Sequence, residues 1–362
     1  MRRRIDMPLL VIGITLILAL GNGVAATVAH TPASPAAKQT EKPAPLIAPV
    51  LDPNLSVLRS LLQQSEDQID LARAKLTIDR MVDPSIDIEA NLAIINGMAA
   101  TENRIIPPGT TIWVKMQTLR QFLYQPGPWN NNAAFHYDFD DAKGTRLENK
   151  LLPHYLATRT GQCVSMPILF LVLAQRIGLD AALAQAPNHE LVMLKGDDGQ
   201  WMNLETTSTG APTKLETYQR QSPMSQESLE KGAFMRPLTK KEAIAAMVEE
   251  VLQLYDQQHR FEQLIAMADL SLQYHPQDVG ILLFRSYAYE DIVRRDFMSV
   301  YPRSSDVPAK LVPRFNALAR ESMRSRQAAV ALGAMPVTAE GEAAYADKLA
   351  RGKAAMAKGE NP

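Results

Sequence analysis

Hydrophobic residues recur at helical spacing along most of the chain. From Asn54 onward, leucine and isoleucine follow one another at intervals of three or four positions, which is the spacing of one helix face. The first block of predicted helices covers 54–82, 86–100, 111–124 and 147–160. The last block covers 240–256, 260–274, 279–294 and a long stretch from Pro308.

A short β-region separates the two blocks of helices. Residues 181–185 predict one strand, and residues 189–194 and 201–205 predict a hairpin. Between the hairpin strands, Asp197-Asp198-Gly199 fits a three-residue turn with Gly199 in the left-handed conformation. Residues 125–144 are polar and rich in turn formers, and predict a loop. The pattern therefore predicts an α+β fold: a helix-rich core with a small antiparallel sheet, followed by an all-helical C-terminal region.

The N-terminal residues 1–29 have the pattern of a signal peptide. Three arginines precede an apolar run from Pro8 to Leu20, and small residues follow. The alternative is a membrane anchor over residues 8–29, which is long enough to span a bilayer. Both interpretations predict a periplasmic or secreted protein. Residues 30–53 are rich in proline and alanine and predict an extended linker without a core.

The amino-acid composition excludes some classes of function. The 362 residues are 46% hydrophobic, and 38 basic residues nearly balance 39 acidic ones, which argues against nucleic-acid binding through bulk charge. A single cysteine excludes an internal disulfide. No glycine-rich phosphate loop or paired-histidine metal motif is present, so we expect no cofactor and no metal.

The one cysteine, Cys163, lies where the most apolar helix begins. Pro167 is tolerated only in a first helical turn, so the helix starts close to Cys163, and Gly178 suits its C-terminal end. A helix N-terminus stabilises a thiolate, and its free N–H groups can hold an oxyanion. Cys163 is therefore a candidate nucleophile. The alternative is a buried small apolar side chain.

His189 and Glu205 are the other candidate catalytic residues. Side chains alternate along a strand, so a hairpin loop with an odd number of residues places His189, Asn203 and Glu205 on one face. His189 would accept the thiol proton and Glu205 would orient its ring, with Asn203 as the second choice for that role. The alternatives are a histidine facing water and an exposed charge at a strand end.

These residues resemble a known group of proteins. The sequence that carries the resemblance is Gly161-x-Cys163, Leu173-Ala174-x-Arg176-x-Gly178-Leu179, His189 and Trp201-x-x-x-Glu205. This pattern is similar to the transglutaminase-like superfamily, which has a papain-like cysteine fold and a Cys-His-Asp triad. The resemblance implies the same roles for Cys163, His189 and Glu205, although the chain has a glutamate where the superfamily usually has aspartate.

The flanking sequence resembles the SirB-type bacterial branch of that superfamily, over about Gln68 to Tyr289. Some members of the branch lack the cysteine. Residues 245–276 are similar to a tetratricopeptide-like helical unit. The spacing of Trp129 from Cys163 resembles that of a tryptophan that helps form the oxyanion site in animal transglutaminases. At Trp129 we nevertheless expect a packed aromatic side chain. The expected domains are 54–235, transglutaminase-like with N-terminal helices; 236–334, tetratricopeptide-like; and 335–362, a helical or frayed tail.

Two functions follow as hypotheses. The first is a cysteine hydrolase or acyltransferase that cleaves an amide bond of a peptide or protein, cell-wall peptides included. The second is a non-catalytic module with the same fold that binds a peptide or a protein. In either case the helical tail is a candidate surface for a protein partner, nucleic acid is not an expected partner, and the N-terminal segment is a candidate membrane tether.

Overall fold

The computed structural model describes residues 46–141, 143–222, 224–335, 343, 346–347 and 349–354. The predicted leader, residues 1–29, and the linker up to residue 45 lie outside these ranges. Within them, none of the helices combines the length and the apolar character needed to cross a bilayer.

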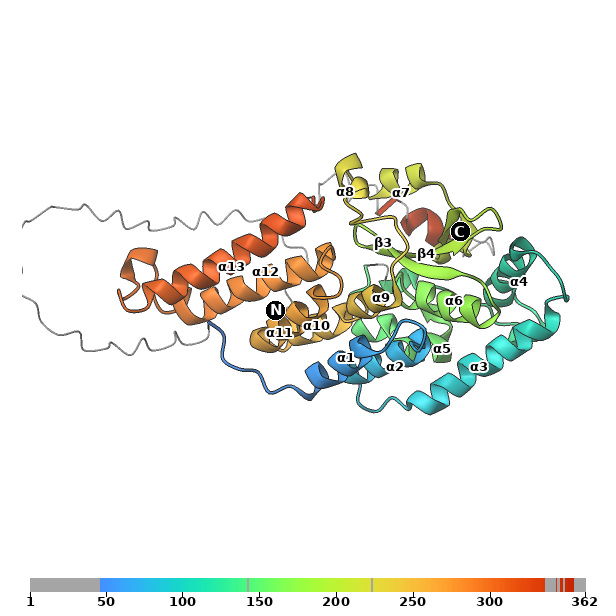
Figure 1. The fold of residues 1–362 in the computed structure, drawn as a ribbon, viewed down its shortest axis with the longest axis horizontal. Helices are drawn as coiled ribbons and strands as arrows, with labels where there is room; N and C mark the ends of the chain where they lie inside the picture. The colour runs from blue at the N-terminus through green and yellow to red at the C-terminus, as the bar shows by residue number, and fades with distance from the viewer. Residues whose placement is uncertain are drawn as a thin grey trace, which may run out of the picture.

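Helices dominate the described chain, and two small sheets lie in its middle (Figure 1). Before the main sheet come α1 Pro53–Gln63, α2 Leu71–Val82, α3 Ile88–Ile105, α4 Ile112–Tyr124, α5 Leu152–Thr158 and α6 Ser165–Arg176. After it come α7 Leu215–Gln221, α8 Gln226–Glu230, α9 Lys240–Ala246, α10 Glu249–Gln257, α11 Phe261–Leu272, α12 Val279–Val293 and α13 Val312–Ala331. The strands are β1 His136–Tyr137, β2 Thr160–Gly161, β3 Ala181–Ala186, β4 His189–Lys195, β5 Trp201–Glu205 and β6 Ala211–Pro212. The predicted α+β class agrees with this helix-rich architecture.

Short single-turn helices fill several connections between these elements. They are η1 Pro128–Asn130, η2 Phe139–Asp141, η3 Leu147–Lys150, η4 Thr206–Ser208, the π-turn η5 Arg294–Met298 and η6 Ser304–Asp306.

Three predicted helices are shorter than expected. The range 54–82 contains two helices, because the side chain of Asp70 accepts hydrogen bonds from Ala72 and Arg73 and starts α2 anew. The range 147–160 contains η3 and then α5, since Pro153 lacks an N–H and must lie in a first turn. The range 240–256 is divided between α9 and α10 by a tightened turn at Met247 and Val248. The strands β1, β2 and β6 and the helices α7 and α8 were not predicted, since so few residues carry little periodicity. Thr160, expected at the end of a helix, lies in β2.

The main sheet has the order β3-β4-β5-β6, with antiparallel neighbours throughout. The predicted hairpin turn is confirmed: Gly196 N–H donates to the Gln200 carbonyl at 2.8 Å, and Gly199 has a φ of +76°. Met193 pairs with Asn203 in the register of β4 and β5. Side chains at every second position of a strand point to the same face. His189, four positions before Met193, and Glu205, two positions after Asn203, therefore lie on the same side of the sheet.

Both faces of this sheet are buried. On one face, Val192, Leu194 and Leu204 join the main core. That core surrounds α6, whose residues from Ser165 to Ala174 are all buried, as the apolar sequence predicted. On the other face, Leu191 and Met193 join a smaller core formed with α7, α8 and the segment after it. The face that carries His189 and Glu205 is therefore shielded from water.

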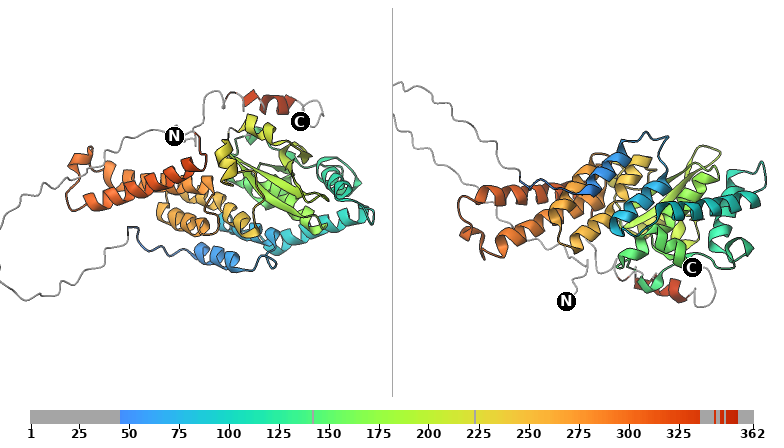
Figure 2. Two further views of the ribbon diagram at one scale, coloured as in Figure 1. Left: turned by 45° about the horizontal axis from the view of Figure 1, so that its top comes forward. Right: turned by 90° about the horizontal axis from the view of Figure 1, so that it is seen from below.

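Helices from both ends of the chain share the main core. Buried residues of α1 to α4 and of α9 to α13 belong to it. Figure 1 shows α12 and α13 side by side at one end of the molecule and the main sheet with α6 at the other. The helical residues 349–354 return to the sheet end (Figure 2), where Lys353 Nζ lies 2.9 Å from Asp140 Oδ1.

The described end of the predicted linker packs against the core. Leu46 and Ile47 contact it, and the Tyr255 hydroxyl donates to Asp52 Oδ2 at 2.6 Å. The prediction of a linker without a core is therefore wrong for residues 46–53, because their two aliphatic side chains and one carboxylate find partners on the helices.

A buried ionic cluster joins α2 to α10. Lys75 Nζ lies 2.8 Å from Asp79 Oδ1 and 3.3 Å from Glu250 Oε2, and none of the three side chains is more than 2% exposed. Burial raises the pKa of Asp79 to about 6, against the opposing effect of Lys75. Burial, reinforced by Glu250, also raises the pKa of the nearby Glu190 well above its ordinary value. The single cation of Lys75 is thus the charge that makes these buried carboxylates tolerable.

Replacement of Lys75 by methionine should therefore destabilise the fold at pH 7 by about 3–5 kcal/mol, since it leaves buried carboxylates without a counter-charge. Urea unfolding followed by circular dichroism measures this loss. The loss should shrink at pH 5, where the carboxylates can take up protons. The double variant Lys75→Met with Glu250→Gln is the matched control and should recover part of the stability. An equal loss at both pH values would contradict this account of the cluster.

Candidate functional site

Cys163 lies in the turn that connects β2 to α6, two residues before the first residue of the helix. Its side chain is half-buried. The parallel pairing of β1 with β2 fixes the start of this turn, where Asp138 N–H donates to the Gly161 carbonyl at 2.8 Å. The predicted position of Cys163 at a helix start is confirmed.

Gly161 is required by the close approach of its neighbours. A Cβ atom at this position would lie 2.5 Å from the Tyr155 ring and 2.7 Å from Ser165 Oγ. The Ser165 hydroxyl accepts a hydrogen bond from Gln162 N–H and donates one to the Asn149 carbonyl, each at 3.0 Å. The glycine in the Gly161-x-Cys163 pattern therefore lets the chain pass close enough for Ser165 to tie the turn down.

The buried side chain of Gln162 holds the turn from the other side. Its amide nitrogen donates to the Asp138 carbonyl at 3.1 Å and to the Asp141 carbonyl at 2.8 Å. Asn149 Nδ2 in turn donates to the carboxylates of Asp138 and Asp141, at 2.8 and 2.9 Å. These bonds make the loop 138–149 a rigid support for the residue that follows Gln162, which is Cys163.

His189 and Glu205 are in direct contact across the hairpin. Nε2 of His189 lies 2.8 Å from Oε2 of Glu205. The other carboxylate oxygen, Oε1, accepts from the backbone N–H and the hydroxyl of Thr207, at 3.0 and 2.6 Å. Asn203, the second choice as orienting residue, instead directs its amide nitrogen to the Thr213 carbonyl at 3.4 Å. The carboxylate that meets the imidazole is that of Glu205.

Electrostatics favour a charged imidazole at this position. Burial of His189 opposes protonation, but the Glu205 carboxylate and a hydrogen bond with the Cys163 side chain outweigh it and raise the pKa of His189 to about 10. The ring of Tyr218 packs beside the imidazole, with centroids 6.1 Å apart. The structure thus brings His189 and Glu205 into contact, and Cys163 lies near enough to the ring to raise the pKa of His189.

The backbone around Cys163 offers a donor for a developing negative charge. Among the described residues, the N–H of Cys163 donates to no acceptor. The side-chain amide of Gln162 is already committed to two carbonyls and is not such a donor. Trp129 stands over Gly127, with ring atoms 2.3–2.6 Å from where a Cβ would lie, as a packed aromatic. Its indole nitrogen is buried without a partner in the described chain.

The described residues contain no group of three or more histidine, cysteine, aspartate or glutamate side chains placed to hold a metal ion. What the arrangement can do chemically is move a proton between sulfur, imidazole and a reacting group, with a carboxylate behind the ring.

Sequence reasoning missed the residues that support the site. Gln162 and Asn149 act through buried hydrogen bonds that pair segments far apart in sequence, and no local pattern marks them. Thr207 could have been found, because a hydroxyl two residues after a carboxylate commonly folds back on it. Tyr218 lies on the unpredicted helix α7.

Glu205→Gln should lower the pKa of His189 from about 10 toward its ordinary value near 6.5, since the carboxylate is the largest effect that raises it. A raised pKa in the folded state adds stability that is full below about pH 6.5 and is lost as pH rises through about 10. The variant should therefore lose stability at pH 7 and show a smaller further decline toward pH 10. Imidazole NMR titration measures the pKa, with Asn203→Ala as control. An unchanged His189 pKa in Glu205→Gln would sink this account.

Comparisons with known proteins bear on the same region. Neither the curated proteins nor the solved structures gave a match. Residues 95–249 match the family model described as the transglutaminase-like superfamily. The matched range runs from α3 to the first residue of α10 and contains Cys163, His189 and Glu205. Residues 95–249 are therefore similar to a transglutaminase-like domain, a likeness that suggests a cysteine-protease-like fold.

Proposed function

We propose that the protein is a cysteine-dependent hydrolase or acyltransferase that acts on an amide bond, with Cys163 as nucleophile, His189 as base and then acid, and Glu205 as the orienting carboxylate. The observation that carries the proposal is the position of the His189 ring, whose Nε2 lies 2.8 Å from Glu205 and whose pKa is raised by Glu205 and by the Cys163 side chain. The family match over residues 95–249 supports the same reading.

In the first half-reaction, the Cys163 sulfur attacks the amide carbonyl carbon while its proton resides on His189. A C–S bond forms, and the carbonyl π-electrons move to oxygen. The free N–H of Cys163 would stabilise this oxyanion. Collapse of the tetrahedral intermediate breaks the C–N bond, and His189 gives its proton to the departing amine. The product is a thioester on Cys163.

In the second half-reaction, water or an amine attacks the thioester. His189 takes a proton from the attacking group, and the Cys163 thiolate departs. Water yields a carboxylic acid, whereas an amine yields a new amide. The acyl-enzyme is common to both outcomes, so hydrolysis and transamidation need the same three side chains.

Glu205 acts by keeping the ring in place and charged. Its second oxygen is held by Thr207, which leaves the first directed at His189. Inside a shielded site a fixed carboxylate stabilises an imidazolium more strongly than it would in water. The longer side chain of glutamate, relative to the usual aspartate, is accommodated because Thr207 folds back on it.

The proposed setting is outside the cytoplasmic membrane, with residues 1–29 as signal peptide or residues 8–29 as tether. The proposed substrates are peptide or protein amides, cell-wall peptides among them. The resemblance to the SirB-type branch and the tetratricopeptide-like character of the C-terminal helices belong to the same proposal, as does a protein partner for those helices.

Iodoacetamide labelling tests the nucleophile. At pH 6, Cys163 should react about tenfold or more faster than the same cysteine in His189→Ala, because a paired imidazolium sustains the thiolate where a free thiol is protonated. Mass spectrometry follows the rate. Asn203→Ala should label like the wild type. Equal rates in wild type and His189→Ala would assign the protein to the alternative, a binding module that keeps the fold without catalysis.

Cys163→Ala should abolish turnover of peptidyl p-nitroanilides by the purified protein, and its circular dichroism spectrum and unfolding midpoint should stay close to those of the wild type. Glu205→Gln should lower kcat by about 10²-fold or more, as loss of an orienting carboxylate does in related triads. A Cys163→Ala protein with unaltered turnover would refute the assignment of the nucleophile. If Asn203→Ala lowers turnover and Glu205→Gln does not, the orienting residue is Asn203.

A further inference from the structure

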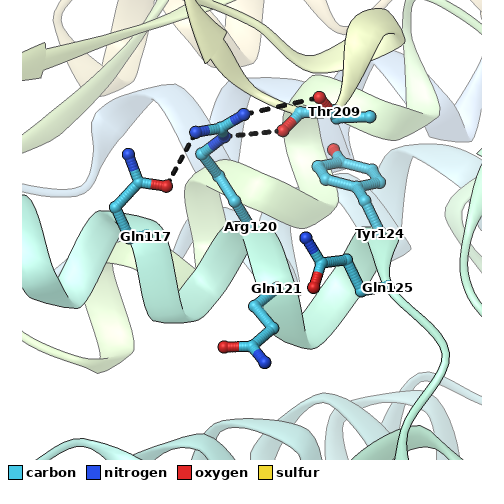
Figure 3. Close-up of a pocket in the computed structure, with 6 residues that line it drawn as sticks. All are labelled: Gln117, Arg120, Gln121, Tyr124, Gln125 and Thr209. Carbon is cyan, nitrogen blue, oxygen red and sulfur yellow. Dashed lines mark hydrogen bonds between the residues drawn. The ribbon is translucent and has the colours of Figure 1, made fainter. Parts of the chain in front are cut away.

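A polar pocket of about 220 Å³ lies between α4 and the turn that follows β5 (Figure 3). Four of its residues lie on α4, Gln125 caps the end of that helix, and the sixth is Thr209. The lining residues are Gln117, Arg120, Gln121, Tyr124, Gln125 and Thr209. The α4 residues are spaced three or four positions apart, so they form one stripe along the helix. Along this stripe Gln121 and Gln125 are exposed, Gln117 and Arg120 are half-buried, and Tyr124 is buried.

Arg120 supplies the charge of the pocket. Its Nε donates to the Thr209 carbonyl at 2.9 Å and its Nη1 donates to Gln117 Oε1 at 2.8 Å, while Nη2 reaches the Thr209 hydroxyl at 3.5 Å. All three acceptors are neutral. No carboxylate of the described residues pairs with this guanidinium, and burial lowers its pKa. Two of its five N–H groups are left for a ligand.

Tyr124 supplies an unused donor. Its side chain is 4% exposed, and its hydroxyl has no hydrogen-bond partner in the described chain. In Figure 3 the hydroxyl is directed toward Thr209, on the same side of α4 as the Arg120 guanidinium. The Tyr124 ring is held by stacking on Phe170 of α6, with centroids 6.5 Å apart. A rigid phenol with an unpaired hydroxyl beside an unpaired cation is arranged to bind an acceptor with negative charge.

The pocket lies behind the proposed catalytic carboxylate. Thr209 follows Glu205 by four positions, and Gly210 N–H closes the turn by donating to the Glu205 carbonyl at 2.9 Å. A Cβ at Gly210 would lie 2.7 Å from Phe170 and 3.2 Å from the Arg120 side chain, so the turn is packed directly on α4 and α6.

We propose that this pocket is a binding site for a carboxylate, in which Arg120 and Tyr124 bind the two oxygens and the amide of Gln125, which lies beside Tyr124 in Figure 3, binds the atoms next to them. One guanidinium fork among neutral donors matches a planar group with a single charge. A phosphate dianion would need further cations, and the lining holds none. The carboxylate can be the C-terminus of a peptide or an acidic side chain.

The test uses the full chain and three small probes, with the Arg120 Nε–H and the Thr209 and Gly210 amides followed by NMR. N-acetyl-glycylglycine carries a C-terminal carboxylate, N-acetyl-glutamate methylamide carries a side-chain carboxylate, and N-acetyl-glycylglycinamide carries neither. Saturable shifts with either acid, at dissociation constants on the order of 1 mM, and none with the amide are expected. The acid that binds more tightly identifies the source of the carboxylate.

Variants assign the contacts. Arg120→Gln and Tyr124→Phe should each weaken acid binding about tenfold or more, the cost of losing a hydrogen bond to a charged group. Arg104→Gln, on the exposed end of α3, should bind like the wild type. If Arg120→Gln does not fold, the affinity of Tyr124→Phe for the acids tests the proposal on its own. Equal shifts with acid and amide, unchanged affinity in Tyr124→Phe, or binding of inorganic phosphate in place of either acid would overturn the proposal.

This site stands apart from the proposed catalysis. Cys163→Ala should bind the acids as the wild type does, because the sulfur contributes nothing to the pocket. If the acids bind but Cys163 labels slowly, the carboxylate site stands and only the catalytic proposal fails. If Cys163 labels fast but neither acid binds, the catalytic proposal stands and only the carboxylate site fails.

Discussion

The position of Cys163 depends on one buried side-chain amide, that of Gln162. Its two hydrogen bonds to the carbonyls of Asp138 and Asp141 attach the turn before α6 to a loop about twenty residues upstream. A buried amide left without these partners would cost roughly 1–3 kcal/mol for each lost bond, so the turn has one favoured conformation. Gly161 permits that conformation, and Ser165 closes it. The thiol is therefore presented by a rigid framework and not by a flexible loop.

Shielding on both faces gives the His189–Glu205 contact its strength. The main core covers one side of the sheet, and the smaller core with Tyr218 covers the other. Charges in such surroundings interact more strongly than at the surface, but they also cost more to bury. Thr207 offsets part of that cost with two short hydrogen bonds to Glu205. The Glu205 carboxylate in turn raises the pKa of His189 against the opposing effect of burial.

The sequence predicted the structural features that depend on short-range periodicity. The apolar run after Cys163 placed α6, and Gly199 fixed the hairpin turn, which in turn set the face shared by His189 and Glu205. It failed where structure depends on distant partners. The pairing of β1 with β2 involves two residues on each strand, too few to carry a pattern. The buried ion pair between Lys75 and Glu250 joins positions 175 apart, so neither residue could be recognised as core from its own neighbours.

The turn after β5 contributes to both proposed sites through opposite ends of one short segment. Glu205 begins it and faces His189, whereas Thr209 ends it and accepts from Arg120. Thr209 has a φ of +63°, a left-handed conformation that a β-branched residue adopts only when its surroundings impose it. The guanidinium of Arg120 is one such constraint, since it binds both the carbonyl and the hydroxyl of Thr209. The two proposed sites therefore meet at one segment of five residues, 205–209, although they use different side chains of it.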